Sequence, residues 1–203
     1  MNKHLTKKPL LKTFIKPLLG LGSLFSRFAI ATLLVTLAGC LGMPKDVKPV
    51  DNFELQRYLG KWYEIARLDH SFERELEAVT AEYSMREDGG VRVINRGYSP
   101  SEDSWEQAEG RAYFVDGKDT AYLKVSFFGP FYGSYVVFNL DKDNYQYAFV
   151  SGPDNDYLWL LARTPRVPEA LINDFVEAAQ QRGFDSQALI FVDQSQHSDT
   201  DPE

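Results

Sequence analysis

Cys40, the only cysteine of the 203-residue chain, is the side chain best suited to covalent chemistry. It follows Leu37-Ala38-Gly39 and an apolar run over residues 28–39, and the six charged residues upstream of that run are all basic. A basic stretch, an apolar stretch and small residues before a cleavage point are the layout of a secretory signal peptide. The sequence therefore predicts that residues 1–39 are removed. A lone cysteine also excludes a disulfide within the chain.

The cysteine at the cleavage point resembles the lipobox of bacterial lipoproteins. This resemblance implies that Cys40 becomes the mature N-terminus and carries palmitate and diacylglycerol, which anchor the protein in a membrane. Leu41 stands where many lipoproteins of the inner membrane have an aspartate, which favours the outer membrane, on its periplasmic face. A membrane-spanning helix is the weaker alternative, because it needs about 20 apolar residues and this run is shorter.

Other side chains suited to catalysis or metal binding are few. Residues 40–203 hold two histidines, His70 and His197, and they contain no Gly-x-Ser-x-Gly motif, phosphate-binding glycine-rich loop or Cys/His cluster. The charged neighbours of His70 are typical of a solvated loop histidine. Asp199, Asp201 and Glu203 lack the spacing of a calcium-binding loop. We therefore expect no enzymatic activity, no metal site and no cofactor.

Processing makes the protein strongly acidic. Loss of six positive charges and no negative ones changes the net charge from −7 to −13 over the remaining 164 residues. Such a charge argues against nucleic acid as a partner and against electrostatic docking on anionic lipids. The length fits one domain. We expect a lipidated N-terminus and tether over residues 40–51, a folded domain over 52–192 and a flexible polar tail over 193–203.

Short apolar segments separated by turn residues predict that the domain is all-β. Leu123, Val125 and Phe127 share one face of their segment, and polar turns join successive segments without an intervening helix. Eight antiparallel up-and-down strands close readily into a β-barrel, which removes unpaired edges and can hold one small ligand. The expected strands are 61–68, 79–86, 91–98, 105–115, 120–127, 132–140, 145–150 and 157–163.

One helix is predicted after the strands. Pro168 suits a helix start, Leu171, Phe175 and Ala179 recur at helical spacing, and Gly183 suits the residue just past a helix end. We expect this apolar stripe to pack on the outer wall of the barrel. Residues 188–192 are a candidate for a short final strand.

Two parts of the sequence resemble the lipocalin family. Gly60-Lys61-Trp62 is similar to its Gly-x-Trp signature, and Arg163 matches its late arginine. Blocks over residues 58–67, 123–133 and 156–159 are similar to bacterial outer-membrane lipocalins of the Blc type, which are related to apolipoprotein D. The resemblance covers about residues 52–192. It implies a lipocalin β-barrel with a C-terminal helix outside, in which Gly60, Trp62 and Arg163 close one end. A guanidinium lying on an indole gains cation–π energy there.

The same resemblance implies storage or transport of a fatty acid or lysophospholipid in the cell envelope. An apolar cup gains about 0.8 kcal/mol for each methylene group that it buries. Trp159 shares a strand face with Arg163 and is the first candidate for the cavity wall. The other candidates are Phe127, Tyr132, Phe149 and Ala66. Alternation defines two faces of each strand but does not say which one is inside.

The ring-rich connection over residues 128–133 is interpreted as an apolar lip at the open end of the barrel. Such a lip would meet lipid or a second subunit of a homodimer, and ordinary loop packing is the alternative. Two other functions compete with lipid binding: an envelope-stabilising lipoprotein whose barrel is filled, and an enzyme acting on lipids.

Overall fold

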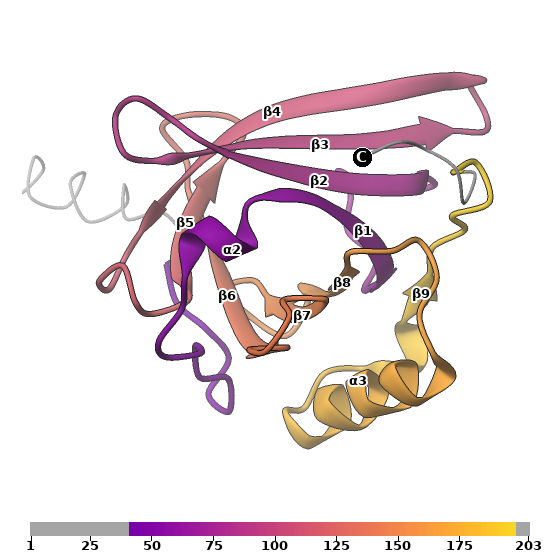
Figure 1. Ribbon diagram of the computed structural model, residues 1–203. Coiled ribbons are helices and arrows are strands. Elements are labelled where there is room, and N and C mark those ends of the chain that lie inside the picture. The colour runs from indigo at the N-terminus through magenta and orange to yellow at the C-terminus, as the bar shows by residue number, and fades with distance from the viewer. Residues whose placement is uncertain (1–40, 198–203) are drawn as a thin grey trace, which may run out of the picture. The chain divides into compact units, whose positions relative to one another are not determined.

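The structure is a computed structural model that describes residues 41–197. The expected signal peptide, the lipidation site Cys40 and residues 198–203 lie outside the described residues. After the short helix α2 (Leu55–Tyr58), the chain forms β1 (Gly60–Arg67), β2 (Glu77–Met85), β3 (Val91–Ser99), β4 (Ser104–Phe114), β5 (Tyr122–Ser126), β6 (Gly133–Leu140), β7 (Tyr147–Ser151) and β8 (Leu158–Ala162). Helix α3 (Glu169–Gln181), the 3-10 turn η1 (Ser186–Ala188) and β9 (Ile190–Phe191) follow (Figure 1). Within residues 41–197, no helix is long and apolar enough to cross a membrane.

The sheet closes on itself. Each strand from β1 to β8 pairs antiparallel with the next, and β8 pairs back with β1. This confirms the predicted all-β, eight-stranded up-and-down barrel. The turn residues act as expected in the β2–β3 hairpin, where Gly89 takes a φ of +80° and Asp88 Oδ1 accepts a hydrogen bond from the Gly90 N–H at 3.0 Å.

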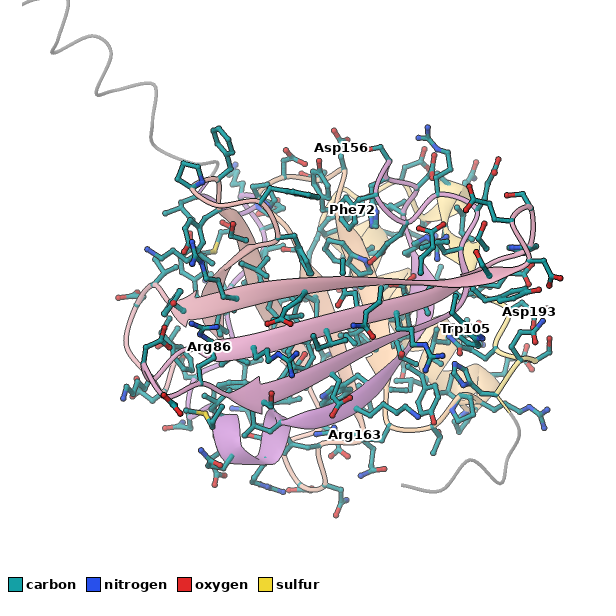
Figure 2. The ribbon with its side chains drawn as sticks, turned by 90° about the horizontal axis from the view of Figure 1, so that it is seen from above. Phe72, Arg86, Trp105, Asp156, Arg163 and Asp193 are labelled. Carbon is teal, nitrogen blue, oxygen red and sulfur yellow. The ribbon has the colours of Figure 1, made fainter. Side chains whose placement is uncertain are left out.

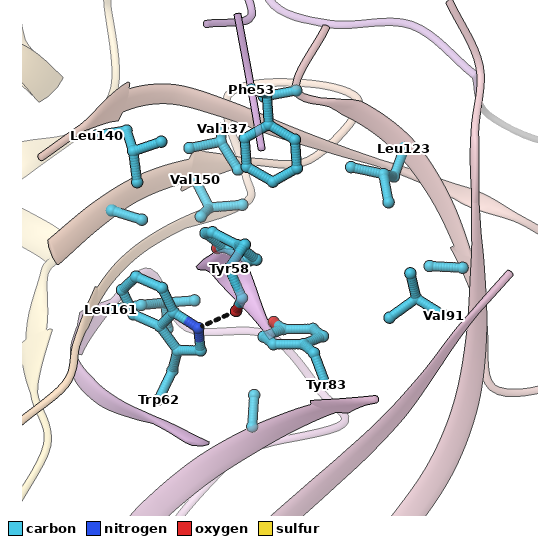
Figure 3. Close-up of a cluster of buried hydrophobic side chains, with 14 of the residues drawn as sticks. Phe53, Tyr58, Trp62, Tyr83, Val91, Leu123, Val137, Leu140, Val150 and Leu161 are labelled. Carbon is cyan, nitrogen blue, oxygen red and sulfur yellow. Dashed lines mark hydrogen bonds between the residues drawn. The ribbon is translucent and has the colours of Figure 1, made fainter. Parts of the chain in front are cut away.

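Side-chain alternation gives the sheet two apolar faces. The inner face forms a cluster that includes Tyr83, Leu123 and Leu161 (Figure 3). The outer face of β1, β7 and β8 is covered by α3, whose Phe175 ring lies 5.0 Å from the ring of Phe149. The helix therefore packs on the outside of the barrel as predicted, and the Phe175 side chain alone contributes about 1.5–3 kcal/mol by burial.

Residues 42–51, expected to be a tether, instead lie along the barrel wall. The Gly42 N–H donates to Ser134 Oγ at 2.9 Å, and the Val50 N–H donates to the Val137 carbonyl at 2.9 Å. Val47 is buried in the outer apolar cluster. Prolines in this segment mark an extended chain, and an extended chain can hydrogen-bond to a neighbouring strand. Residues 42–51 are therefore bound to the barrel wall and do not form a free tether.

Residues 193–197, expected to belong to a flexible tail, are docked as well. Gln194 is buried, and its Nε2 donates to the carbonyls of Glu64 (2.7 Å) and Val79 (3.1 Å). These carbonyls lie at register shifts in β1 and β2, where a bulge leaves backbone groups without a partner in the ladder. The tail supplies the missing donors, so this part of the chain is held by the need to satisfy buried carbonyls.

Candidate functional site

The barrel encloses a cavity with two connected chambers. The inner chamber has a volume of about 90 Å³ and the outer one about 290 Å³. The chambers share the lining residues Phe72, Glu73, Asn95, Val125 and Phe127. Together they lie near the lower end of the usual range for ligand sites, about 300–1,000 Å³. A cavity of this volume suits a slender ligand rather than a bulky ring system.

The closed end of the barrel is built by the residues that carry the lipocalin resemblance. The guanidinium carbon of Arg163 lies 3.9 Å from the centre of the Trp62 ring, and Trp62 Nε1 donates to the Tyr58 carbonyl at 2.8 Å (Figure 3). Arg163 also donates to the carbonyls of Lys61 and Arg57, both at 2.8 Å. Gly60 has a φ of +91° beside this contact. The structure thus brings Gly60, Trp62 and Arg163 together below the cavity, opposite the end that carries Phe72 and Asp156 (Figure 2).

Three tyrosine hydroxyls meet inside the lower half of the barrel. Tyr135 lies between the other two, with its hydroxyl 2.7 Å from that of Tyr58 and 2.9 Å from that of Tyr83. Burial raises the pKa of all three phenols above the usual value. The hydroxyls satisfy one another, so the base of the inner chamber presents uncharged rings.

A polar cluster lies in the cavity wall nearer the mouth. Arg67 Nη1 donates to Glu64 Oε1 at 2.8 Å, and Arg67 Nη2 donates to the Glu73 carbonyl at 2.8 Å. Trp159 Nε1 donates to Glu73 Oε2 at 3.3 Å. All three charged residues are buried, and Glu64 and Glu73 line the inner chamber. One guanidinium is therefore paired with the Glu64 carboxyl group and lies close enough to the Glu73 carboxyl group to lower its pKa, all within a buried site.

Electrostatics keep this cluster from holding its full negative charge. Burial raises the pKa of Glu64 well above its usual value, and the neighbouring Glu73 adds to the rise. Burial also raises the pKa of Glu73, although the hydrogen bond from Trp159 and the charge of Arg67 lower it. Two like charges side by side in a low-dielectric wall favour a shared proton. With that proton and the Arg67 guanidinium, the two carboxyl groups carry little net charge.

His70 completes the cluster as a neutral ring. It stacks on Phe72 with the ring centres 4.2 Å apart and lies 4.9 Å from the Trp159 ring. Its Nε2 is 3.6 Å from Glu73 Oε2, too far for a hydrogen bond, and neither ring nitrogen has a hydrogen-bond partner among the described residues. Burial lowers the pKa of His70 to about 4. The solvated histidine expected from the sequence is instead buried against aromatic rings.

This lowered pKa makes the stability depend on pH. The unfolded chain binds the His70 proton near the usual value of 6.5, whereas the native state binds it only near 4. The contribution is therefore complete above pH 6.5 and is lost as the pH falls toward 4. We expect His70→Phe to match the original protein at pH 7 and to lose about 3 kcal/mol less between pH 7 and pH 4. Urea unfolding at both pH values measures this difference. Equal losses in the two proteins would show that His70 titrates normally.

Two of the five predicted cavity residues line the cavity. Trp159 lines the inner chamber, and Phe127 lines both chambers. Tyr132 lies outside, where its hydroxyl accepts a hydrogen bond from Arg111 Nε at 3.0 Å. Phe149 and Ala66 belong to the outer cluster beneath α3. The roles of Trp159 and Phe127 in ligand binding stay predictions.

The misplaced residues have physical explanations. The pairing of β1 with β8 shifts between Glu64 and Ala66, so a bulge turns Ala66 outward and Arg67 inward. Phe149 pairs with Leu160 on the outer face, whereas its neighbour Val150 pairs with Trp159 on the inner face. The sequence prediction for Phe149 was wrong because it assigned the outer face of β7 to the cavity.

Sequence reasoning missed the polar cluster and the tyrosines. Glu64 shares the strand face of Trp62, which was an available signal for an inward side chain. Glu73 sits in the β1–β2 loop, and only the folded chain brings it to Asn95 of β3 and Trp159 of β8. Tyr58, Tyr83 and Tyr135 also come from three different elements. No group of residues that could hold a metal ion occurs within residues 41–197.

Comparisons with known proteins agree with this architecture. A family model for the lipocalin-like domain matches residues 53–194. The outer membrane lipoprotein Blc of Vibrio cholerae serotype O1 is 64% identical over 160 residues, which cover 79% of this chain and 94% of the relative. The Blc protein of Escherichia coli K12 is 51% identical over 166 residues, which cover 82% and 93%.

More distant relatives extend the same family. Apolipoprotein D of Mus musculus is 30% identical over 152 residues, which cover 71% of this chain and 79% of the relative. The structure of insecticyanin from the tobacco hornworm Manduca sexta aligns with a TM-score of 0.60 at 22% identity, over 78% of this chain and 88% of that one, and shows the shared fold. The chain therefore belongs to the lipocalin-like family, among the lipid-anchored lipoproteins of the bacterial outer membrane.

Proposed function

We propose that this protein stores or carries a single-chain lipid, a fatty acid or a lysophospholipid, at the outer membrane. The observation that carries the proposal is the small apolar cavity, whose inner chamber is walled by side chains such as Val91, Leu123 and Trp159. Each methylene group buried there stabilises the complex by about 0.8 kcal/mol. An anchor on Cys40 would keep the cavity within reach of the membrane that supplies the ligand.

The mostly apolar wall indicates how such a ligand is oriented. Glu64 and Glu73 are the charged residues among those that line the inner chamber. Burial of a charged head group among the apolar side chains of this wall would cost its hydration, whereas burial of an uncharged acyl tail would not. We infer that the tail enters first and that the head group stays at the mouth, near the exposed loops.

Trp159→Ala is expected to weaken lysophospholipid and fatty acid binding roughly tenfold, because it removes about 1.5 kcal/mol or more of apolar wall. The measurement is native mass spectrometry of the processed chain, stripped of bound lipid and titrated with each ligand. Trp105→Ala is the matched control: Trp105 is 40% exposed on β4 and is not part of either chamber's lining.

The same titration separates the competing functions. An affinity unchanged by Trp159→Ala would remove this residue from the binding site. Absence of binding by all the lipids would favour a structural lipoprotein, whose barrel is filled by its tyrosines. Turnover of the lipid during incubation would favour an enzyme.

A further inference from the structure

We propose that the open end of the barrel docks directly on the phospholipid bilayer that holds the anchor, with Phe128 and Phe131 inserted at its surface. This inference rests on the proposed lipid-binding function and deepens it, because it assigns the route by which a ligand enters. The β5–β6 loop, residues 127–132, is the docking element and is called the docking loop below.

The docking loop presents the most exposed large apolar side chains of the described residues. Phe128 is 80% exposed and Phe131 is 70% exposed, and Phe72 of the neighbouring β1–β2 loop is 54% exposed. All three rings line the outer chamber of the cavity. Water contact with such rings is unfavourable, and their burial in a membrane surface would remove it.

Basic side chains stand directly behind the exposed rings. Arg111 donates to the Tyr132 hydroxyl, and a side chain at Gly129 would come within 2.6 Å of Arg111 Nη2, so the guanidinium lies beside the docking loop. Lys124 Nζ lies 5.1 Å from the centre of the Tyr132 ring. At a membrane surface the phosphates lie outside the acyl chains. Aromatic rings at the tip of the docking loop would meet the acyl chains, and the basic groups behind them would meet the phosphates.

The described part of the chain begins next to the same loop. Gly42 donates to Ser134 Oγ, and Ser134 follows Phe131 by three residues. An ideal side-chain carbon at Gly42 would also lie 3.8 Å from the carbonyl of Pro153 in the β7–β8 loop, at the same end of the barrel. Only Leu41 separates Gly42 from Cys40, and two residues of chain span at most about 7 Å. Acyl chains on Cys40 must therefore enter the bilayer beside the docking loop.

The acidic residues at the open end of the barrel indicate which lipid head groups the docking surface would tolerate. The β7–β8 loop carries Asp154 and Asp156, and Asp156 lies with Phe72 at one end of the barrel (Figure 2). These carboxylates and the acidic net charge oppose close approach to an anionic surface. The occupant that fits is a bilayer rich in zwitterionic phospholipid, into which the rings insert beside the anchor.

The experiment uses the lipidated protein reconstituted in phosphatidylcholine vesicles. Cys40 is the only cysteine, and in the lipidated protein diacylglycerol would block its thiol, so Phe131→Cys provides a single free thiol for a fluorescent label. We expect phosphatidylcholine carrying a shallow spin label to quench this fluorophore. Phe191→Cys is the matched control, since Phe191 of β9 is 54% exposed and lines neither chamber, and its label should be quenched by aqueous iodide.

Two results at position 131 would overturn the proposal. Quenching by iodide would leave the loop in water, and protection from both quenchers would assign it to a second copy of the protein. Neither result concerns lipid affinity, so the proposed function would stand.

A second variant tests the consequence for ligand entry. Phe128→Ser combined with Phe131→Ser is expected to slow uptake of a fluorescent lysophospholipid from the vesicles roughly tenfold more than uptake of the same lipid supplied as monomers in solution. Phe191→Ser should leave the uptake rate unchanged. An unchanged rate in the double variant would refute the docking role, whereas failure of every protein to bind the lipid would refute the proposed function itself.

Discussion

Replacing Trp62 by alanine is expected to lower the free energy of unfolding by about 3–5 kcal/mol. Trp62 is fully buried, and its removal opens a void between the Tyr58 ring, 4.6 Å away, and the Arg163 guanidinium. The buried Tyr58 carbonyl also loses its hydrogen-bond donor. Urea unfolding of the processed chain, followed by circular dichroism, measures the loss.

Arg163→Met separates packing from the cation–π contact. We expect it to cost about 1–3 kcal/mol, because the carbonyls of Arg57, Lys61 and Tyr145 lose a shared donor. In a double-mutant cycle, the Trp62–Arg163 coupling should be about 0.5–2 kcal/mol. Strictly additive losses would show that the two side chains contribute independently.

Arg67→Met is expected to cost about 3–5 kcal/mol at pH 7, because it leaves Glu64 and Glu73 buried without their cation. The backbone carbonyls of Glu73 and Leu76 lose their donor as well, which loosens the β1–β2 loop at the mouth. The pKa of both carboxyl groups is already raised, so acid protonates them readily. The stability that depends on their proton is present at low pH and is lost as the pH rises through their native pKa.

The cost of Arg67→Met should therefore shrink between pH 7 and pH 5. Unfolding experiments at both pH values check this, and Arg92→Met serves as the control because the Arg92–Glu109 pair is exposed. The control should change little at either pH. A cost for Arg67→Met that did not vary with pH would mean that the arginine acts through its backbone contacts alone.

The barrel could be predicted from the sequence because its signals are local. Turns such as Glu87-Asp88-Gly89-Gly90 separate the strands, and the alternation of Leu123, Val125 and Phe127 correctly identifies an inward face. Trp62 and Arg163 could be paired because each carries a family signature. Trp159 followed from Arg163, because Arg163 directly follows β8 and no bulge interrupts the pairing of β8 with β7.

The rest of the site depends on information that no single segment contains. The bulge at Ile65 reverses the faces of β1 beyond Glu64, and nothing in the local pattern marks it. Glu73 acquires its role only when a loop folds against β1, β3 and β8. The Gln194 amide donates hydrogen bonds to carbonyls that bulges leave unpaired in β1 and β2, two strands far from it in the sequence. These are long-range requirements of hydrogen bonding in a closed sheet.

The docked N-terminal segment has a kinetic consequence. A flexible tether of eleven residues would have a root-mean-square end-to-end distance of about 18 Å. It would leave the barrel free to rotate in every direction relative to its anchor. With Gly42 and Val50 fixed to β6, that freedom is reduced to the rotation of a one-residue linker. The effective concentration of the barrel mouth at the membrane rises accordingly. For the docking proposed above, an encounter of the mouth with the bilayer would then be an intramolecular event that starts from nearly the same orientation each time.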